Sequence, residues 1–289
     1  MRSLLFVPAD SDAKLAKAPA SGADALLIDL EDSISDANKA KARSMAADFL
    51  RQHAASPARP ALIVRVNPLS SDLIDADLDA VVAARPDAIL LPKAEGGRSV
   101  IHLDAKLSAR EAMHGLPDGH IKVIAIATET AASLFAAGTY RDASARLIGL
   151  TWGAEDLSAD LGAEANRDAQ GGFLDPYRLA RTLCLAGAAA AEVPAIDTVH
   201  VDFRDTDGLR REAEEARRDG FTGKMAIHPA QVPVINEVFT PSPEAVAKAR
   251  AIVDAFAGAP EAGVVAIDGA MVDRPHLIRA QRILGRIER

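Results

Sequence analysis

The chain has 289 residues, which is enough for one α/β barrel or for two ordinary domains. Nearly half of the residues are hydrophobic (49%), about a quarter are charged (26%) and aromatic residues are few, a composition that is typical of a helix-rich α/β protein and excludes a disordered chain. The formal net charge of −8 argues against binding to nucleic acid or to an anionic membrane, because both need a basic face that replaces counterions.

The first predicted element is a strand in the N-terminal stretch MRSLLFVPAD. Its apolar run before Pro8 is too short for the hydrophobic region of a signal peptide or for a membrane span. The single cysteine of the sequence, Cys184, lies in the apolar segment RTLCLAGAAA, so no intrachain disulfide can form and we expect a buried core thiol. These features predict a cytoplasmic protein with no membrane partner.

Eight short aliphatic runs recur along the chain and predict eight strands. They cover residues 3–8, 25–30, 61–66, 88–93, 122–128, 146–152, 198–203 and 223–229. Segments of helical composition lie between these runs or follow the last one, and they include 11–22, 37–54, 206–220, 241–259 and 276–289. Gly220 suits the position just after a helix end.

This alternation predicts a parallel sheet covered by helices, and eight units predict a TIM (β/α)8 barrel over residues 1–235. A doubly wound sheet is the alternative, but no Gly-x-Gly-x-x-Gly follows the first strand. Residues 236–289 are not needed to close a barrel. We expect them to form a C-terminal helical extension with a turn in DGAMVDRP (268–275), which packs on the barrel or on a neighbouring subunit.

Polar residues at the ends of the predicted strands are candidates for the active site, because barrel sites form at the carboxyl ends of the strands. The candidates are Asp29, Glu31, Asp32, Arg65, Asn67, Lys93, Glu129, Glu155, Asp156, Asp202 and His228. Each has an ordinary structural interpretation, such as helix capping by Asp32. Their recurrence on seven strands favours a site.

Three of these candidates predict specific chemistry. Arg65 lies within an apolar strand and needs an anionic partner, which is either Asp29 or Glu31 of the chain itself or a substrate carboxylate. Glu129 and Asp156 follow neighbouring strands, and two adjacent carboxylates repel each other unless a cation or proton lies between them. An all-oxygen Mg²⁺ site is the natural hypothesis.

Several stretches together resemble a known family. They are LLFVPAD, SGADALLIDLEDS with NKAKAR, RVN, LPKAE, TET, GLTWGAEDLSADLG, GFTGKMAIHPAQVPVINEVFTPSPEAVAKA and GAMVDRP. Over essentially the whole chain, and in order, the sequence resembles the citrate lyase β-subunit family. That family belongs with malyl-CoA lyase and citramalyl-CoA lyase among the HpcH/HpaI-type aldolases.

The resemblance implies roles for individual residues. Glu129 and Asp156 would hold Mg²⁺, or Mn²⁺ in its place, and Asp29 and Glu31 would orient waters around the metal. Binding of a 2-oxo or 2-hydroxy acid would fall to Arg65, Gly153, Ala154, Glu155 and Asp156. Glu155 also suits the first turn of a helix.

The resemblance further implies catalysis by Arg65 and by Asp273, the latter as an acid/base donated to a neighbouring subunit of a homotrimer or hexamer. Pro8, Lys14 and Lys17 would lie near coenzyme A. The implied reaction is cleavage of a 3-hydroxyacyl-CoA, such as malyl-CoA or citramalyl-CoA, to glyoxylate or pyruvate and an acyl-CoA.

Three alternatives remain open at this point. One is a thioesterase or a malate-synthase-like condensing enzyme on the same substrate, and another is a citrate lyase subunit that depends on an acyl-carrier protein. A non-catalytic binding role would require Arg65, Glu129, Asp156 and Asp273 all to be idle.

Overall fold

The computed structural model describes residues 1–54, 56, 58–267 and 269–287 of the chain. It divides into two compact units, Met1–Asn236 and Glu237–Arg289. Helix α9 (Val232–Phe239) spans the division.

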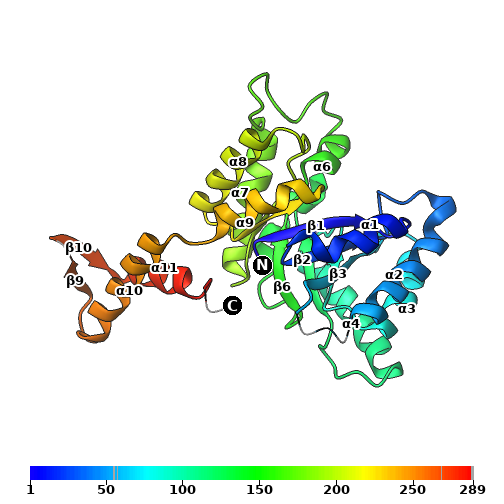
Figure 1. Ribbon diagram of the computed structural model, residues 1–289, viewed down its shortest axis with the longest axis horizontal. Coiled ribbons are helices and arrows are strands. Elements are labelled where there is room, and N and C mark those ends of the chain that lie inside the picture. Colours follow the sequence, from blue (N-terminus) through cyan, green and yellow to red (C-terminus); the bar gives the residue numbers. More distant parts are fainter. Residues whose placement is uncertain (55, 57, 268, 288–289) are drawn as a thin grey trace. The chain divides into compact units, whose positions relative to one another are not determined.

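The first unit is built on eight parallel strands (Figure 1). They are β1 (Ser3–Pro8), β2 (Ala25–Asp29), β3 (Ala61–Arg65), β4 (Ala88–Leu91), β5 (Lys122–Ile126), β6 (Leu147–Thr151), β7 (Ile196–Asp197) and β8 (Gly223–Ala226). The order is β6-β5-β4-β3-β2-β1-β8-β7, and a parallel bridge between Leu150 and Ala195 brings β6 to β7, so the sheet closes on itself. The predicted TIM barrel is confirmed.

Apolar side chains from alternate strand positions fill the barrel. The interior cluster comprises Leu4, Ala25, Leu27, Ile63, Ala88, Leu90, Ile124, Ile126, Ile196 and Met225. None of these residues exposes more than 4% of its surface. Each fully buried Leu or Ile side chain contributes about 1.5–3 kcal/mol, so this cluster explains why the strands converge.

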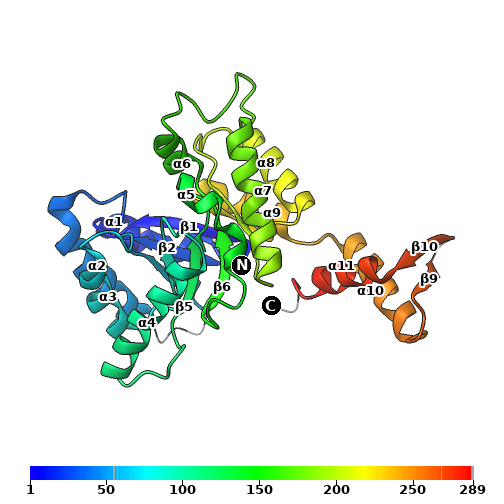
Figure 2. The same ribbon diagram turned by 180° about the vertical axis from the view of Figure 1, so that it is seen from behind.

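Helices surround the strands, and Figures 1 and 2 show α2, α3 and α4 side by side on one flank of the barrel. The helices of this unit are α1 (Asp12–Lys17), α2 (Lys39–His53), α3 (Ile74–Val81), α4 (Gly97–Met113), α5 (Ala131–Leu134), α6 (Ala154–Leu161), α7 (Asp175–Ala190) and α8 (Thr206–Asp219). Gly220 ends α8 with φ +123°, a conformation that favours glycine, as predicted. Cys184 is buried on α7, also as predicted.

The prediction of the seventh strand at 198–203 was wrong. The strand is β7, which has only two residues and ends at Asp197. Beyond it, the carbonyl of His200 accepts a hydrogen bond from Gln231 Nε2 at 2.8 Å instead of joining the sheet. At this point a side-chain amide from the segment after β8 takes the place of a backbone hydrogen bond between strands. Asp202 lies in an exposed loop.

The second unit has its own small core. Helices α10 (Pro243–Ala257) and α11 (Arg274–Leu284) pack together, and β9 (Val264–Ile267) pairs antiparallel with β10 (Ala270–Asp273). Its buried residues are Ala249, Ile252, Phe256, Val272 and Ala280. The predicted C-terminal helices are present, but the predicted turn in 268–275 proves to be mainly a strand and the start of α11. Asp268 lies outside the described residues.

Across the described ranges, no helix is both long enough and apolar enough to span a membrane.

Candidate active site

The sheet register brings the predicted polar residues to one end of the barrel. Asp29, the last residue of β2, lies opposite Arg65, the last residue of β3. Lys93 and Glu129 follow β4 and β5, and Asp156 lies in the first turn of α6 after β6. Five consecutive strands thus deliver charged side chains to the carboxyl rim.

Arg65 is held by two carboxylates of its own chain. Its Nε and Nη2 donate to Asp29 Oδ1 and Oδ2, both at 2.7 Å, and its Nη1 lies 2.9 Å from Glu31 Oε2. The guanidinium also lies 4.8 Å from the centre of the Phe6 ring. Internal pairing, one of the two predicted alternatives, is therefore present. Because each Nη carries two N–H groups, donors remain for a substrate carboxylate.

The same contacts fix the protonation of this pair. Burial opposes the charge of Asp29, but the hydrogen bonds from Arg65 outweigh burial and lower the pKa of the Asp29 carboxyl. The pKa of Arg65 is raised in turn, since burial is again outweighed by Asp29. The pair is thus a fixed ion pair near neutral pH.

Glu31 lies in the loop after β2, and the buried Lys39 stabilises this loop by hydrogen bonds. Lys39 Nζ donates to the carbonyls of Leu30 and Glu31, at 2.9 and 2.8 Å, and to Asn67 Oδ1 at 2.9 Å. Glu31 Oε1 accepts from Lys93 Nζ at 2.6 Å, whereas its buried Oε2 has the Arg65 charge nearby but no hydrogen bond of good geometry. Burial raises the pKa of Glu31 to about 7, against the lowering effects of Arg65 and Lys93.

Lys93 connects the other carboxylates. Its backbone N–H donates to Glu129 Oε2 at 2.6 Å, and its Nζ lies 2.9 Å from Asp156 Oδ1. Lys93 has φ +50°, a left-handed conformation that costs an L residue about 1–2 kcal/mol. Sequence reasoning placed Lys93 at a strand end but found no role for it, because nothing in the sequence signals a left-handed lysine.

Glu129 is deeply buried, with 3% of its surface exposed. Burial, followed by the charge of Asp156, raises the pKa of Glu129 to about 8. Gly153 lies directly against it: a Cβ at position 153 would come within 2.8 Å of both Cγ and Oε1 of Glu129. The bare backbone of Gly153 therefore leaves room for the Glu129 carboxylate beside the start of α6.

The donor set suits a hard cation. Glu129 and Asp156 supply carboxylate oxygens, the buried Glu31 Oε2 has no hydrogen-bond partner, and burial together with the charge of Asp156 raises the pKa of Glu129. Within the part of the chain that the structure describes, no group of three or more His, Cys, Asp or Glu side chains is placed to hold a metal ion, so the protein offers the pair Glu129 and Asp156. Such an open set fits Mg²⁺, which takes one or two carboxylates and fills its other positions with water and substrate oxygens.

The start of α6 also follows the sequence prediction locally. Gly153 is the N-cap and Ala154 the first residue of the helix, so their N–H groups lie at its positive end. Glu155 is exposed and accepts a hydrogen bond from Asn166 Nδ2 at 2.8 Å. Asp160, to which the sequence assigned no role, accepts from the backbone N–H of Ala131 at 2.6 Å, close after Glu129 in the chain.

A buried network anchors the residue before Gly153. Trp152 Nε1 donates to Asp197 Oδ1 at 2.8 Å, and Lys224 Nζ donates to Asp197 Oδ2 at 2.7 Å. Lys224 Nζ also lies 3.4 Å from Glu212 Oε2, which His200 Nδ1 approaches to 3.1 Å. Burial opposes the charge of Glu212, but His200, Lys224 and Arg167 outweigh burial and lower the pKa of Glu212 to about 2.

The residues predicted to lie near coenzyme A are at the start of the barrel. Pro8 ends β1 and is partly buried, and Lys14 and Lys17 are exposed on α1. His228, another predicted rim residue, is exposed two residues after β8 and stacks on Phe203 with ring centres 4.4 Å apart. None of these contacts tests a role in binding, so those roles stay predictions.

Asp273 belongs to the second unit. It ends β10, precedes α11 and contacts His276 Nδ1 through its carboxylate, with 48% of its side chain exposed. Hydrogen bonding from His276 lowers the pKa of Asp273. Its predicted role as an acid/base donated across a subunit interface stays a prediction.

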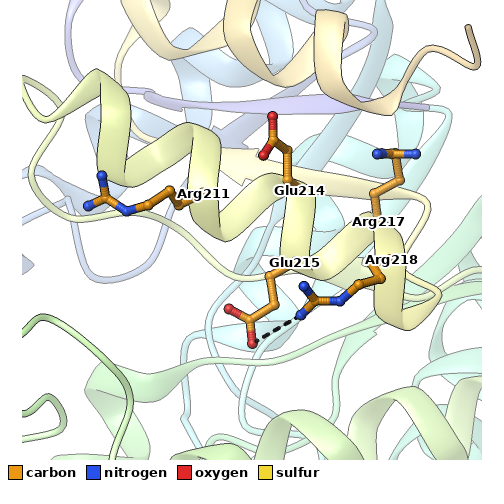
Figure 3. A pocket seen from close by; sticks show the side chains of 5 residues that line it. All are labelled: Arg211, Glu214, Glu215, Arg217 and Arg218. Atoms are coloured by element: carbon orange, nitrogen blue, oxygen red, sulfur yellow. Dashed lines mark ion pairs between the residues drawn. The ribbon is translucent and has the colours of Figure 1, made fainter.

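A hollow of about 550 Å³ lies elsewhere, on the outer face of α8 (Figure 3). Its lining residues are Arg211, Glu214, Glu215, Arg217 and Arg218. All five come from one helix, and the ion pair between Arg218 and Glu215 is long, at 3.9 Å. This hollow is therefore a solvated, charged helix face and not a binding site. The candidate active site is the group of charged residues at the carboxyl rim of the barrel.

Comparison with known proteins assigns the family. A family model described as HpcH/HpaI aldolase/citrate lyase matches residues 2–229, which is the barrel with its rim. The chain belongs to the HpcH/HpaI aldolase/citrate lyase family. The resemblance seen in the sequence motifs is thereby confirmed, and the chain is an enzyme of the carbon–carbon lyase type.

Relatives within the HpcH/HpaI family differ in named activity. Citramalyl-CoA lyase of Rattus norvegicus is 33% identical over 299 residues, covering 98% of this chain and 85% of the relative. A (3S)-malyl-CoA thioesterase of Cereibacter sphaeroides is 35% identical over 293 residues, covering 99% of this chain and 94% of the relative.

A solved structure of the family is also similar to this chain along its length. It is CitE of Mycobacterium tuberculosis in complex with magnesium, acetoacetate and coenzyme A, with a TM-score of 0.78 and 36% identity over 100% of this chain and 98% of that chain.

Proposed function

We propose that this chain is a Mg²⁺-dependent lyase that cleaves a 3-hydroxyacyl-CoA to a 2-oxo acid and an acyl-CoA. Malyl-CoA, giving glyoxylate and acetyl-CoA, and citramalyl-CoA, giving pyruvate and acetyl-CoA, are the substrates of the expected size. Family membership and the magnesium and coenzyme A in the related CitE structure support this proposal.

The observation that carries the proposal is the grouping of Arg65, Glu129 and Asp156 at the carboxyl rim beside the bare backbone of Gly153. A cation and a guanidinium side by side suit a substrate with a carboxylate and a neighbouring oxygen. When bound, Mg²⁺ supplies Lewis-acid stabilisation of negative charge on these oxygens.

The residues of the chain divide the remaining work. Arg65, kept in place by Asp29, uses its remaining N–H groups to bind the carboxylate that becomes part of the 2-oxo acid. The N–H groups at the start of α6 face the same anion from Gly153 and Ala154. Glu129 and Asp156 hold the cation, and Glu31 orients its waters.

The reaction breaks the bond between C2 and C3 of the acyl chain. The carboxylate of Asp273 from a neighbouring subunit takes the proton of the 3-hydroxyl, C3 becomes the carbonyl carbon of the 2-oxo acid, and the electron pair of the broken bond passes to C2 as a thioester enolate. Asp273, now in its acid form, then delivers this proton to C2 and returns to the carboxylate. This assignment gives the C-terminal unit a function in a homo-oligomer.

The experiment is incubation of the pure protein with Mg²⁺ and malyl-CoA or citramalyl-CoA, with separate detection of 2-oxo acid, free hydroxy acid and coenzyme A. We expect the 2-oxo acid and acetyl-CoA in equal amounts, and no turnover when EDTA replaces Mg²⁺. Release of malate and coenzyme A without glyoxylate would refute the lyase and establish the thioesterase, the activity named for the Cereibacter relative.

A further inference from the structure

Lys93 makes two separate contacts with the proposed metal ligands. Its backbone N–H reaches Glu129 Oε2 at 2.6 Å, while its ammonium group lies 2.9 Å from Asp156 Oδ1. The residue that donates this N–H has a left-handed backbone, with φ +50°. Strained backbone of this kind persists where the surroundings hold it in place, and it is frequent in functional sites.

The ammonium group of Lys93 lies among several carboxylates. Besides Asp156, it lies 2.6 Å from Glu31 Oε1 and 3.6 Å from Asp32 Oδ2. These carboxylates come from the loop after β2 and from α6. The positive charge of Lys93 therefore links the loop after β2 to the start of α6.

The positive charge of Lys93 offsets the negative charges of the carboxylates around it. The other cation of the group, Arg65, already forms a two-pronged ion pair with Asp29. Lys93 is thus the cation that faces Asp156, and removal of its charge would leave Glu31, Glu129 and Asp156 with less compensation. Like charges so close together repel strongly at a partly buried site.

We propose that Lys93 is a positioning residue whose backbone orients Glu129 and whose ammonium group pairs with Asp156 until a divalent cation displaces it. This inference rests on the proposed metal site and deepens it, since it makes Lys93 an internal competitor of Mg²⁺. Metal binding releases the ammonium group from Asp156, while the backbone contact with Glu129 is kept.

The test is Lys93→Met, which removes the charge, keeps most of the length of the unbranched side chain and leaves the backbone N–H of residue 93 in place. Binding of Mg²⁺ alone is measured by titration calorimetry, and thermal unfolding is measured without metal and at saturating Mg²⁺. We expect Mg²⁺ to bind about tenfold more tightly, because a competing charge is gone. We also expect the metal-free variant to melt lower than the wild type and Mg²⁺ to restore most of the difference.

Two further variants complete the test. Lys106→Met removes a partly buried lysine that pairs with Asp75 at 2.8 Å, and it should leave Mg²⁺ affinity unchanged. Lys93→Gln replaces Lys93→Met if the latter does not fold, with the same expected direction. Unchanged or weaker Mg²⁺ binding in the Lys93 variant would overturn this inference alone. Absence of Mg²⁺ binding by the wild type would overturn both this inference and the proposed function.

Discussion

Replacement of Gly153 by alanine would place a methyl group against a proposed metal ligand. The added Cβ would lie 2.8 Å from Cγ and from Oε1 of Glu129, whereas ordinary contacts between such atoms are about 3.5 Å or longer. Glu129 cannot simply swing away, because it is buried and its Oε2 is held by the N–H of Lys93. Either the carboxylate or the start of α6 must therefore move by about 0.7 Å.

A shift of this size at the candidate active site should lower both stability and turnover. Overpacking of a buried position costs about 1–3 kcal/mol in stability. Misplacement by about 1 Å lowers turnover by about 100-fold. We therefore expect Gly153→Ala to fold with a lowered melting temperature, to bind Mg²⁺ more weakly, and to lose about two orders of magnitude in kcat/KM with malyl-CoA or citramalyl-CoA.

The matched control is Gly138→Ala. A Cβ at Gly138 would meet nothing within 4 Å, and its backbone is not in the left-handed region. This variant should keep the activity and Mg²⁺ affinity of the wild type. If Gly153→Ala kept both as well, the argument that Gly153 makes room for a metal-holding Glu129 would be refuted.

Three further predictions concern other parts of the molecule. Glu129→Gln and Asp156→Asn should each abolish Mg²⁺-dependent turnover with an unchanged circular dichroism spectrum, whereas Glu164→Gln, the same change at an exposed position, should not; full activity of either ligand variant would remove it from the metal site. Asp273→Asn should still bind Mg²⁺ and a 2-oxo acid in calorimetry but stop cleavage, so unchanged turnover would show that the proton comes from another group. The lowered pKa of Glu212, about 2 against a usual 4.5, means that its carboxylate stabilises the fold fully above about pH 5 and progressively less as the pH falls toward 2. Acid titration of unfolding should show the wild type losing about 3 kcal/mol that Glu212→Gln does not lose, and equal losses would contradict the role of the buried network.

The barrel could be predicted because its strands are almost wholly apolar. Runs such as those of β2 and β4 are buried at every position, which is the pattern of a parallel sheet covered on both faces. The seventh strand could not be located in this way, since β7 has two residues and its continuation is decided by a distant amide, that of Gln231. The hairpin of the C-terminal unit had a usable signal: an Asp-Gly pair between β-branched and alternating residues.

The candidate site was predictable as a set of residues but not as a set of contacts. Strand ends named Arg65, Glu129 and Asp156 because every parallel strand of a barrel presents its carboxyl end on the same side. The sequence left the partner of Arg65 open, and the structure pairs it with both Asp29, which the register of β2 with β3 places opposite it, and Glu31. The bridging contacts of Lys93, and its left-handed backbone, are features for which periodicity and composition carry no signal.

The closure of the barrel has a consequence for its motion. β1 and β2 share five register positions, whereas β6 meets the chain beside β7 at one bridge, Leu150 to Ala195, with one N–H to O contact of 3.0 Å from Leu150 to Pro194. Local opening is easiest where fewest hydrogen bonds must break, so this seam sets the lowest barrier to breathing of the sheet. The amide of Leu150 should exchange with solvent deuterium sooner than those of β2. The join of the barrel with the fewest hydrogen bonds among the described residues thus adjoins β6, the strand that leads to Asp156, the proposed Mg²⁺ ligand.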